Sequence, residues 1–374
     1  MSKAIFIAAT GQHVGKTTTC LGLMSALRKK IPRVGFIKPV GQMTIKIGTN
    51  QLIDKDVALF YNHFKLPYQL EDMSPIIFPK GFTRDFLDKK ISTEFLEKKI
   101  IKSYHNITTD SDFTVVEGTG HTGVGSIIGF NNAQVAKLLK IPAVLVVKGG
   151  LGSAFDLITL NKALFDMYEV PIKGIVINQM IQEKETMILE YLKKALAPWK
   201  IPILGSIPFD DFLSTLSMQD LCCLFKAHLL SGSQHIYRHF ESIRMVATPV
   251  KDYKRKHTHN QLIITSSTRK DIIMACIQLH KDYRKKIKDS SLEGGIVLTG
   301  KKPPSESILK ALEKCELPSI YIPLSNYQVM EKITSHTAKI REEDLTKVDK
   351  AQNLVEQHLD IAAFLRIFQD GISP

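Results

Sequence analysis

The sequence predicts an α/β protein in which a mostly parallel sheet carries helices on both faces and a smaller α/β domain follows. Up to about Met245, short and nearly continuous apolar runs alternate with longer segments of helical periodicity. Strands of this kind, separated by helices, are typical of a parallel sheet that is buried on both faces. From about Leu262 the alternation resumes over a shorter length, which indicates a second core. At 374 residues the chain is also too long for one ordinary core.

The elements of the first domain follow from these patterns. The expected strands are Ala4–Ala9, Val34–Pro39, Phe113–Glu117, Ala143–Lys148, Gly174–Asn178 and Ile203–Ile207. The expected helices are Thr17–Arg28, Thr93–Tyr104, Asn131–Leu139, Ala154–Tyr168 and Lys184–Ala197.

The segment Arg238–Asn260 interrupts the pattern, because it has little periodicity and contains the basic run Lys251–His259. We therefore expect a first domain over residues 1–245, a linker over 246–260 and a second domain over 261–374. The strands expected in the second domain are Leu262–Thr265, Gly295–Leu298 and Ser319–Ile322. Its expected helices are Lys270–Lys285, Ser305–Lys314, Tyr327–Ser335 and Leu345–Leu359.

The composition, with 44% hydrophobic and 23% charged residues, is that of a globular protein. No apolar run approaches the roughly 20 residues of a membrane span, so no membrane partner is expected. The five cysteines are scattered without C-x-x-C spacing, which favours a cytoplasmic protein with reduced thiols. The net charge of +13 could indicate nucleic-acid binding, but the lysines are spread along the whole chain. We interpret the charge as a solvated surface that prefers anionic ligands, and we expect no nucleic-acid partner.

The strongest motif lies between the first strand and the first helix. The apolar run ends at Ala9, a polar turn covers Thr10–Val14, and Gly15-Lys16-Thr17 opens the helix. Backbone N–H groups at such a helix start bind phosphate, and this order of elements is the P-loop, so the fold class is narrowed to the P-loop NTPase type. Thr10 stands where the motif usually has its first glycine. The predicted nucleotide-binding residues of the loop are Gly11, Gln12, His13, Val14, Gly15, Lys16, Thr17 and Thr18.

Within this loop, Lys16 would reach the β- and γ-phosphates of a nucleotide and the Thr17 hydroxyl would bind Mg²⁺. A second constellation follows the strand that ends at Glu117, where a glycine-rich turn runs from Gly118 to Ser126. A carboxylate at the carboxyl end of a sheet strand can bind the metal of a nucleotide complex. The alternative is an acidic residue that merely ends a strand. We favour the metal site, because so many glycines suit close approach of the backbone to a ligand.

Lys38 ends the second strand, and Pro39 stops regular pairing after it. We expect this strand to lie directly beside the P-loop strand, so that Lys38 points over the same edge of the sheet as Lys16. It would then stabilise charge on a transferring phosphoryl group. The alternative is an ordinary surface lysine.

Three further residues have open interpretations. Asp54 and Asp56 precede a helical segment, where aspartates are usually N-caps but could also bind a metal. Asn178 follows the fifth strand and could contact a nucleotide base or start a turn.

With these residues in view, the chain over roughly residues 1–211 resembles the dethiobiotin synthetase family of P-loop proteins. The strings that carry the resemblance, in the family's order, are ATGQHVGKT, FIKPVG, DKDVAL, VVEGTG, PAVLVVKGGLGS, GIVINQ and LGSIPF. The same module is similar to the N-terminal part of long phosphate acetyltransferases and to part of the cobyrinic acid diamide synthases. The region from about Leu262 to Asp360 resembles the DRTGG domain, through ITSSTRKDIIMAC and GGIVLTG, whose last two residues are Thr299 and Gly300.

The resemblance implies roles for individual residues. Lys16, Thr17 and Thr18 would hold the phosphates and Mg²⁺. The metal would also be surrounded by Glu117 and by Asp56, with Asp54 as the alternative to Asp56. Lys38 would meet the γ-phosphate and an acceptor carboxylate or carbamate, which makes Lys16, Lys38 and Glu117 the expected catalytic residues. Asn178 would contact the base, with Pro208 near it.

These roles imply two alternative functions. The first is an ATP- and Mg²⁺-dependent ligase or synthetase that phosphorylates a small carboxylate or carbamate, which an amine then attacks. The second is a regulatory module that senses ATP with little turnover of its own. The turn GTGHTGVGS differs from the family's substrate-binding turn, and the second domain is an addition to it, so the acceptor is left open. A homodimer is expected in either case.

Overall fold

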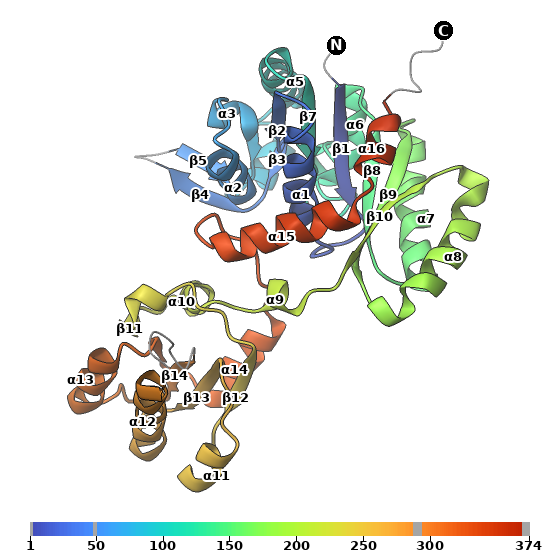
Figure 1. The fold of residues 1–374 in the computed structure, drawn as a ribbon. Helices are drawn as coiled ribbons and strands as arrows, with labels where there is room; N and C mark the ends of the chain where they lie inside the picture. The colour runs from blue at the N-terminus through green and yellow to red at the C-terminus, as the bar shows by residue number, and fades with distance from the viewer. Residues whose placement is uncertain (1–2, 48–50, 287–293, 369–374) are drawn as a thin grey trace. The chain divides into compact units, whose positions relative to one another are not determined.

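The computed structural model describes residues 3–47, 51–286 and 294–368. The chain forms two compact units (Figure 1), of which the first comprises Met1–Asp210 and Ile340–Pro374 and the second Asp211–Lys339. Within the described ranges, no helix combines the length and the apolar character needed to cross a membrane.

A six-stranded sheet forms the centre of the first unit. Its strand order is β10-β9-β8-β1-β7-β2, and all neighbouring strands are parallel. The strands are β1 (Lys3–Ala9), β2 (Val34–Ile37), β7 (Phe113–Glu117), β8 (Ala143–Lys148), β9 (Ile172–Met180) and β10 (Ile203–Pro208). Nearly all of their apolar side chains are buried, as expected of a sheet covered on both faces. The predicted fold class and the six predicted strands of this region are confirmed, with small differences at the strand ends.

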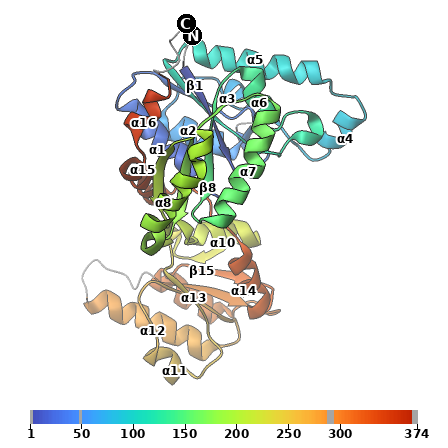
Figure 2. The same ribbon diagram turned by 90° about the vertical axis from the view of Figure 1, so that its right-hand side faces the viewer.

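Helices cover both faces of this sheet. On one face, α1 (Lys16–Arg28) packs with α15 (Leu345–His358) and α16 (Ile361–Arg366). The opposite face carries α5 (Thr93–Thr109), α6 (Asn132–Leu139), α7 (Gly152–Met167) and α8 (Glu185–Leu196), as Figure 2 shows. The strand order explains this division. The chain moves from β1 to β2 in one direction and from β7 to β10 in the other, and right-handed crossovers then place the helices on opposite faces.

The segment between β2 and α5 forms small elements of its own. The strands β3 (Val40–Gly41) and β6 (Ile76–Ile77) pair in parallel, and β4 (Thr44–Ile47) forms an antiparallel hairpin with β5 (Gln51–Asp54). The helices here are α2 (Lys55–Phe64), α3 (Leu70–Met73) and α4 (Phe82–Leu87). The sequence analysis did not predict these strands, because two to four residues are too few to show a strand period.

The second unit is built on a five-stranded sheet of order β11-β15-β14-β13-β12. The strands β12 (Ser242–Met245), β13 (Gln261–Ser266), β14 (Gly295–Thr299) and β15 (Ser319–Ile322) are parallel, whereas β11 (Leu229–Ser231) is antiparallel. One core contains side chains of α11 (Val250–Arg255), α12 (Lys270–Lys286) and α13 (Glu306–Cys315). A second core contains side chains of α10 (Met218–Phe225) and α14 (Asn326–Ser335). This unit is therefore also an α/β layer structure.

The linker predicted over residues 246–260 is wrong. β12 pairs in parallel with β13, and α11 buries Tyr253 in the core that it shares with α12 and α13. Residues 211–245, which were expected in the first domain, also belong to the second unit. The pattern was weak because β12 is a partly exposed edge strand and Tyr253 is the buried residue of a short helix.

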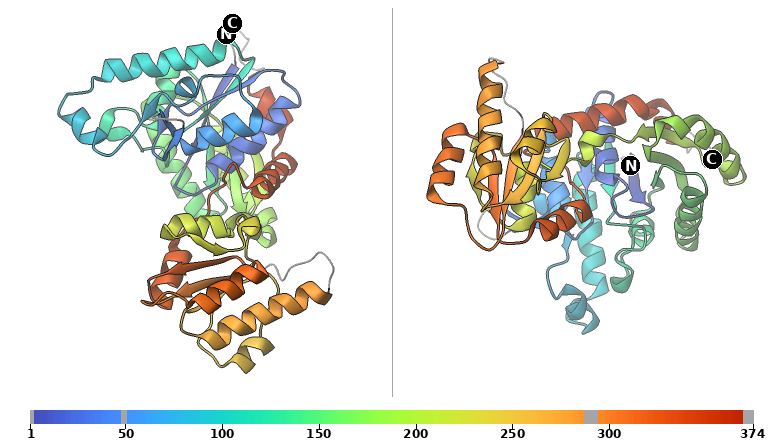
Figure 3. Two further views of the ribbon diagram at one scale, coloured as in Figure 1. Left: turned by 90° about the vertical axis from the view of Figure 1, so that its left-hand side faces the viewer. Right: turned by 90° about the horizontal axis from the view of Figure 1, so that it is seen from below.

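The predicted second domain also extended too far along the chain, to residue 374. α15 and α16 lie beside α1 in the first unit (Figure 1, Figure 3). Gly22 of α1 permits this close approach, because a Cβ atom there would lie 2.2 Å from Cβ of Val355. Phe364 of α16 is buried, with its ring centroid 6.1 Å from that of Phe113 in β7. An amphipathic helix shows in its sequence which face is buried, but not which core it joins.

We expect Phe364→Ala to destabilise the first unit by about 3–5 kcal/mol, because it removes a fully buried aromatic side chain. The measurement is urea unfolding followed by the fluorescence of Trp199, the single tryptophan, which lies in this unit. Leu345→Ala is the control, since Leu345 lies on α15 but is 62% exposed. An unchanged unfolding midpoint for Phe364→Ala would contradict the placement of the C-terminal helices.

Candidate nucleotide and magnesium site

The P-loop connects β1 to α1 as the sequence predicts. His13 and Gly15 have positive φ angles of 59° and 91°, which curl the loop before the helix starts at Lys16. The first turn of α1 contains no acidic residue, so the positive end of the helix dipole is not neutralised by its own sequence. Lys16 Nζ donates a hydrogen bond to the carbonyl oxygen of Gly120, 3.1 Å away, in the turn after β7. Burial lowers the pKa of Lys16, so an anionic phosphate would stabilise its charged form.

Two amide side chains at the end of β9 hold the backbone of this loop. Asn178 Nδ2 donates to the carbonyl oxygen of Val14 at 2.8 Å, and Gln179 Nε2 donates to that of His13 at 3.0 Å. The contact is so close that a Cβ atom at Gly15 would lie 1.9 Å from Asn178 Nδ2. The sequence analysis missed this function of both residues, although the adjacent polar pair at a strand end was a signal for it.

The expected base contact of Asn178 stays a prediction. Its amide nitrogen is engaged with the P-loop, which leaves the amide oxygen for a ligand. Pro208 ends the neighbouring strand β10 and is in register with Met180 at the end of β9. Pro208 therefore lies at the same sheet edge as Asn178.

Glu117 and Thr17 form the part of the site that best suits a divalent cation. Glu117 is fully buried, and its Oε1 accepts a hydrogen bond of 2.9 Å from Thr17 Oγ1. Its Oε2 is buried and has no hydrogen-bond partner in the described part of the chain. Burial, and next the negative charge of Asp56, raise the pKa of Glu117 to about 7. A hydroxyl and a carboxylate with one unused oxygen are the hard ligands that Mg²⁺ prefers, so these residues fit the metal.

Lys38 reaches the same edge by a different route from the expected one. β2 pairs with β7, and β7 separates it from the P-loop strand β1, so the prediction that the two strands are direct neighbours is wrong. Lys38 is only 6% exposed. Its Nζ donates to Asp54 Oδ1 at 2.8 Å and also to Asp56 Oδ2. The alternative of an ordinary surface lysine is therefore excluded.

The charge on Lys38 is stabilised by its surroundings. Burial favours the neutral amine, but nearby carboxylates, led by Asp56 and Asp54, outweigh this effect and raise the pKa of Lys38. Ile37 of β2 is in register with Val116 of β7, so Lys38 and Glu117 follow at neighbouring strand ends. The charges of Lys38 and Asp56 also influence the pKa of Glu117. Lys38 is therefore a permanent positive charge beside the candidate metal site.

The structure separates the roles of Asp54 and Asp56. Asp54 is the N-cap of α2, is fully buried, and accepts hydrogen bonds on both carboxylate oxygens. A metal ligand at Asp54 would have to give up these bonds. Asp56 is half-buried and its carboxylate pairs with Lys38, so the expected metal contact fits Asp56 better than Asp54 and stays a prediction.

The glycine-rich turn after β7 is held by Asn132, which the sequence analysis did not single out. Asn132 Oδ1 accepts from the Thr119 N–H at 3.0 Å, and its Nδ2 donates to the carbonyl oxygens of Thr119 and His121 at 3.2 Å. Thr119 Oγ1 also donates to the carbonyl oxygen of Val40, which connects the turn to β3. The turn that faces Lys16 is thus fixed from two sides.

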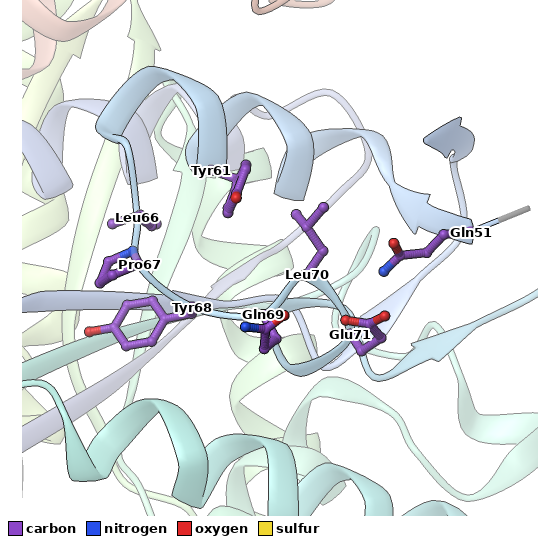
Figure 4. Close-up of a pocket in the computed structure, with 8 residues that line it drawn as sticks. All are labelled: Gln51, Tyr61, Leu66, Pro67, Tyr68, Gln69, Leu70 and Glu71. Atoms are coloured by element: carbon purple, nitrogen blue, oxygen red, sulfur yellow. The ribbon is translucent and has the colours of Figure 1, made fainter. Parts of the chain in front are cut away.

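Two other features lie apart from this chemistry. A small pocket beside α2 and α3 (Figure 4) is lined by none of the predicted site residues. Its lining residues are Gln51, Tyr61, Leu66, Pro67, Tyr68, Gln69, Leu70 and Glu71.

In the second unit, Thr299 ends β14 and Gly300 follows with a φ angle of 106°. Tyr321 Oη donates to the carbonyl oxygen of Gly300 at 2.6 Å, which fixes this turn to the neighbouring strand.

Comparison with known protein families identifies both units. Residues 3–216 match the AAA_26 family, described as an AAA domain, over more than half of the chain. The chain belongs to the AAA_26 family. Residues 220–336 match the DRTGG domain, which begins and ends earlier than the predicted range of 261–374. The resemblance to a dethiobiotin synthetase-like P-loop module followed by a DRTGG domain is therefore confirmed.

Individual relatives agree with this assignment. A phosphate acetyltransferase of Synechocystis is 25% identical over 84% of this chain and 44% of its own length. An ATP-dependent dethiobiotin synthetase of Nitrosopumilus maritimus is 28% identical over 58% of this chain and 93% of its own length. The MinC:MinD cell division protein complex of Aquifex aeolicus aligns over 57% of this chain and 84% of that chain, with 16% identity and a TM-score of 0.35. The chain spans about half the length of the phosphate acetyltransferases that it matches.

The raised pKa of Glu117 predicts a pH dependence of stability. The folded-state pKa of about 7 lies above the usual value of 4.5, so the folded protein keeps a proton that the unfolded chain loses between these pH values. The contribution of Glu117 to stability therefore falls as pH rises from about 4.5 to 7, by at most roughly 1.4 kcal/mol per pH unit. Glu117→Gln should remove this loss, and its stability relative to wild type should increase over the same window.

Urea unfolding of the two proteins, monitored through Trp199 from pH 5 to 8.5, measures this difference. Adding Mg²⁺ should stabilise wild type more at pH 8 than at pH 6, because the cation competes with the proton on Glu117, and should do little for Glu117→Gln. Glu94→Gln, which removes an exposed carboxylate from the first turn of α5, should behave as wild type. A stability difference that is constant with pH, or that shrinks as pH rises, would contradict the assigned state of Glu117.

Proposed function

We propose that this chain is an ATP- and Mg²⁺-dependent enzyme that transfers the γ-phosphoryl group of ATP to a small carboxylate or carbamate. The observation that carries the proposal is the convergence of Lys16, Glu117 and Lys38 on one edge of the sheet. Lys16 and the P-loop backbone suit the phosphates, and Glu117 with Thr17 suits the metal. Lys38 adds a buried cation to Lys16, and simple binding of a nucleotide does not require this second charge.

The chain's own residues would act by position and charge. An acceptor oxygen attacks the γ-phosphorus, the bond to the β,γ-bridging oxygen breaks, and ADP leaves. The product of this step is an acyl phosphate. An amine, the second substrate, then attacks its carbonyl carbon, phosphate leaves, and a proton passes from the amine to solvent. Lys16 and Lys38 would stabilise the charge that spreads over the equatorial oxygens during transfer. Mg²⁺, when held by Thr17, Glu117 and Asp56, supplies further charge neutralisation there.

One relative supports the synthetase chemistry of the proposal. The similarity to an ATP-dependent dethiobiotin synthetase covers nearly the whole of that protein, and favours synthetase chemistry in the first unit. We propose only the chemical class of the acceptor, a carboxylate or carbamate. The glycine-rich turn after Glu117 differs from the substrate-binding turn of the dethiobiotin synthetases, so their substrate is not carried over.

A regulatory ATP-sensing role is the second candidate. It is favoured by the phosphate acetyltransferase relatives, in which this whole arrangement makes up only about half of a longer protein. A sensor would bind Mg²⁺ and ATP at the same residues but would not need the charge of Lys38 for turnover.

The variant Lys38→Met discriminates between the two functions. If Lys38 acts mainly in the transition state, ATP affinity should stay within a few-fold of wild type and turnover should fall by roughly 10²–10³. Affinity is measured by calorimetry, and turnover as ADP release with a panel of carboxylates, or of amines with bicarbonate. Trp199 fluorescence reports whether the variant is folded.

Two further variants serve as controls for this result. Lys16→Ala should lower ATP affinity roughly tenfold or more, because it removes the charge on the phosphates. Lys173→Met should change nothing, since this exposed lysine lies near the amino end of β9, away from the site. If Lys38→Met behaves as Lys16→Ala, Lys38 is a binding residue. If wild type shows no turnover with any acceptor, or Lys38→Met retains it, the enzyme proposal fails and the sensor is favoured.

A further inference from the structure

The Asp54 carboxylate accepts four hydrogen bonds beside the candidate site. Its Oδ1 accepts from Lys38 Nζ at 2.8 Å and from the Asp56 N–H at 3.0 Å. Its Oδ2 accepts from the N–H groups of Gln42 and Met43, at 3.1 and 3.3 Å. The side chain is completely buried.

These contacts join three separate segments of the chain. Lys38 comes from the end of β2, Gln42 and Met43 precede β4, and Asp56 lies in the first turn of α2. The Asp54 carboxylate also lies against the backbone of Gly41, where a Cβ atom would come within 2.7 Å of its Cβ and Oδ2. Asp54 has no room to move without displacing these groups.

These contacts fix the direction in which the Lys38 ammonium group points. An ammonium group has three N–H donors. Asp54 Oδ1 and Asp56 Oδ2 accept two of them, so the third can point only away from both carboxylates. A long and flexible side chain is thereby held with one donor available for an incoming oxygen.

The consequence for Asp56 is that its backbone is fixed at the same place. The bond from its N–H to Asp54 Oδ1 caps α2 and sets the start of that helix. The residue expected to face the metal and the residue expected to face the phosphoryl group therefore share one anchor.

We propose that Asp54 is a positioning residue, which orients Lys38 and the start of α2 for phosphoryl transfer without touching substrate or metal itself. The inference rests on the proposed function, because it assigns Asp54 a role through Lys38. Asparagine cannot replace it. Its single acceptor oxygen would satisfy either Lys38 or the backbone N–H groups, and its NH₂ group would then face donors on the other side.

The test measures how much aluminium fluoride tightens ADP binding in the presence of Mg²⁺, since ADP with aluminium fluoride mimics the transferring phosphoryl group. Calorimetry gives this ratio for wild type, Asp54→Asn, Lys38→Met and the double variant. Lys38→Met should lose tenfold or more of the tightening, and Asp54→Asn should lose a comparable amount while ADP affinity alone stays within a few-fold. The double variant should lose no more than Lys38→Met, because the two residues act as one unit. With an active acceptor, Asp54→Asn should lower kcat and leave KM for ATP nearly unchanged.

Two control variants distinguish a positioning role of Asp54 from a general loss of structure. Asp360→Asn changes another N-cap aspartate of the first unit, at α16, and should keep the wild-type ratio. Gly41→Ala keeps the charge of Asp54 but displaces its carboxylate, and should reduce the tightening in the same direction. If Asp54→Asn does not fold, Gly41→Ala decides the question.

The outcomes separate the two claims. If aluminium fluoride does not tighten ADP binding in wild type, phosphoryl transfer itself fails and the inference fails with it. If wild type shows tightening but Asp54→Asn and Gly41→Ala retain it, the positioning role is overturned and the proposed function stands. Additive losses in the double variant would also overturn it, because Asp54 would then act independently of Lys38.

Discussion

The parallel pairing of β7 between β1 and β2 is the constraint on which the site depends. Parallel strands present their carboxyl ends at one edge of a sheet, so residues that are far apart in the sequence meet there. Lys16 follows β1, Glu117 ends β7 and Lys38 follows β2. β7 is central, because Glu117 lies between the two lysines that act on its carboxylate. The register of three strands therefore sets the charge pattern of the site.

Buried charges of this kind are a poor way to stabilise a fold. Removing one partner of a buried ion pair typically costs about 3–5 kcal/mol, yet the pair as a whole often contributes little net stability. Here Lys38 is paired with two aspartates, and Glu117 keeps one buried oxygen without a partner among the described residues. Apolar residues would fill these positions at lower energetic cost. The arrangement is explained if a cation and a phosphate complete it, because the cation would meet the unused oxygen of Glu117 and the phosphate would meet the remaining N–H donor of Lys38.

Much of this could be predicted from the sequence. Strong periodicity identified the strands and helices of the main sheet, and the motif around Lys16 and Thr17 identified the phosphate site. Strand order was harder, because the sequence shows where β2 lies along the chain but not that β7 inserts beside it. The role of Asp54 was also hidden, since an aspartate before a helix looks the same whether it caps the helix, binds a metal or holds a lysine. The C-terminal helices were assigned to the wrong unit because Val355 and Phe364 show burial without showing against what.

The most direct measurement is a crystal structure of the protein with Mn²⁺ and a non-hydrolysable ATP analogue, with the cation located by its anomalous signal. The account predicts Mn²⁺ bound by Thr17 Oγ1 and by the Glu117 carboxylate, with the terminal phosphate between Lys16 and Lys38. A nucleotide bound elsewhere, or a cation that does not touch Glu117, would contradict it.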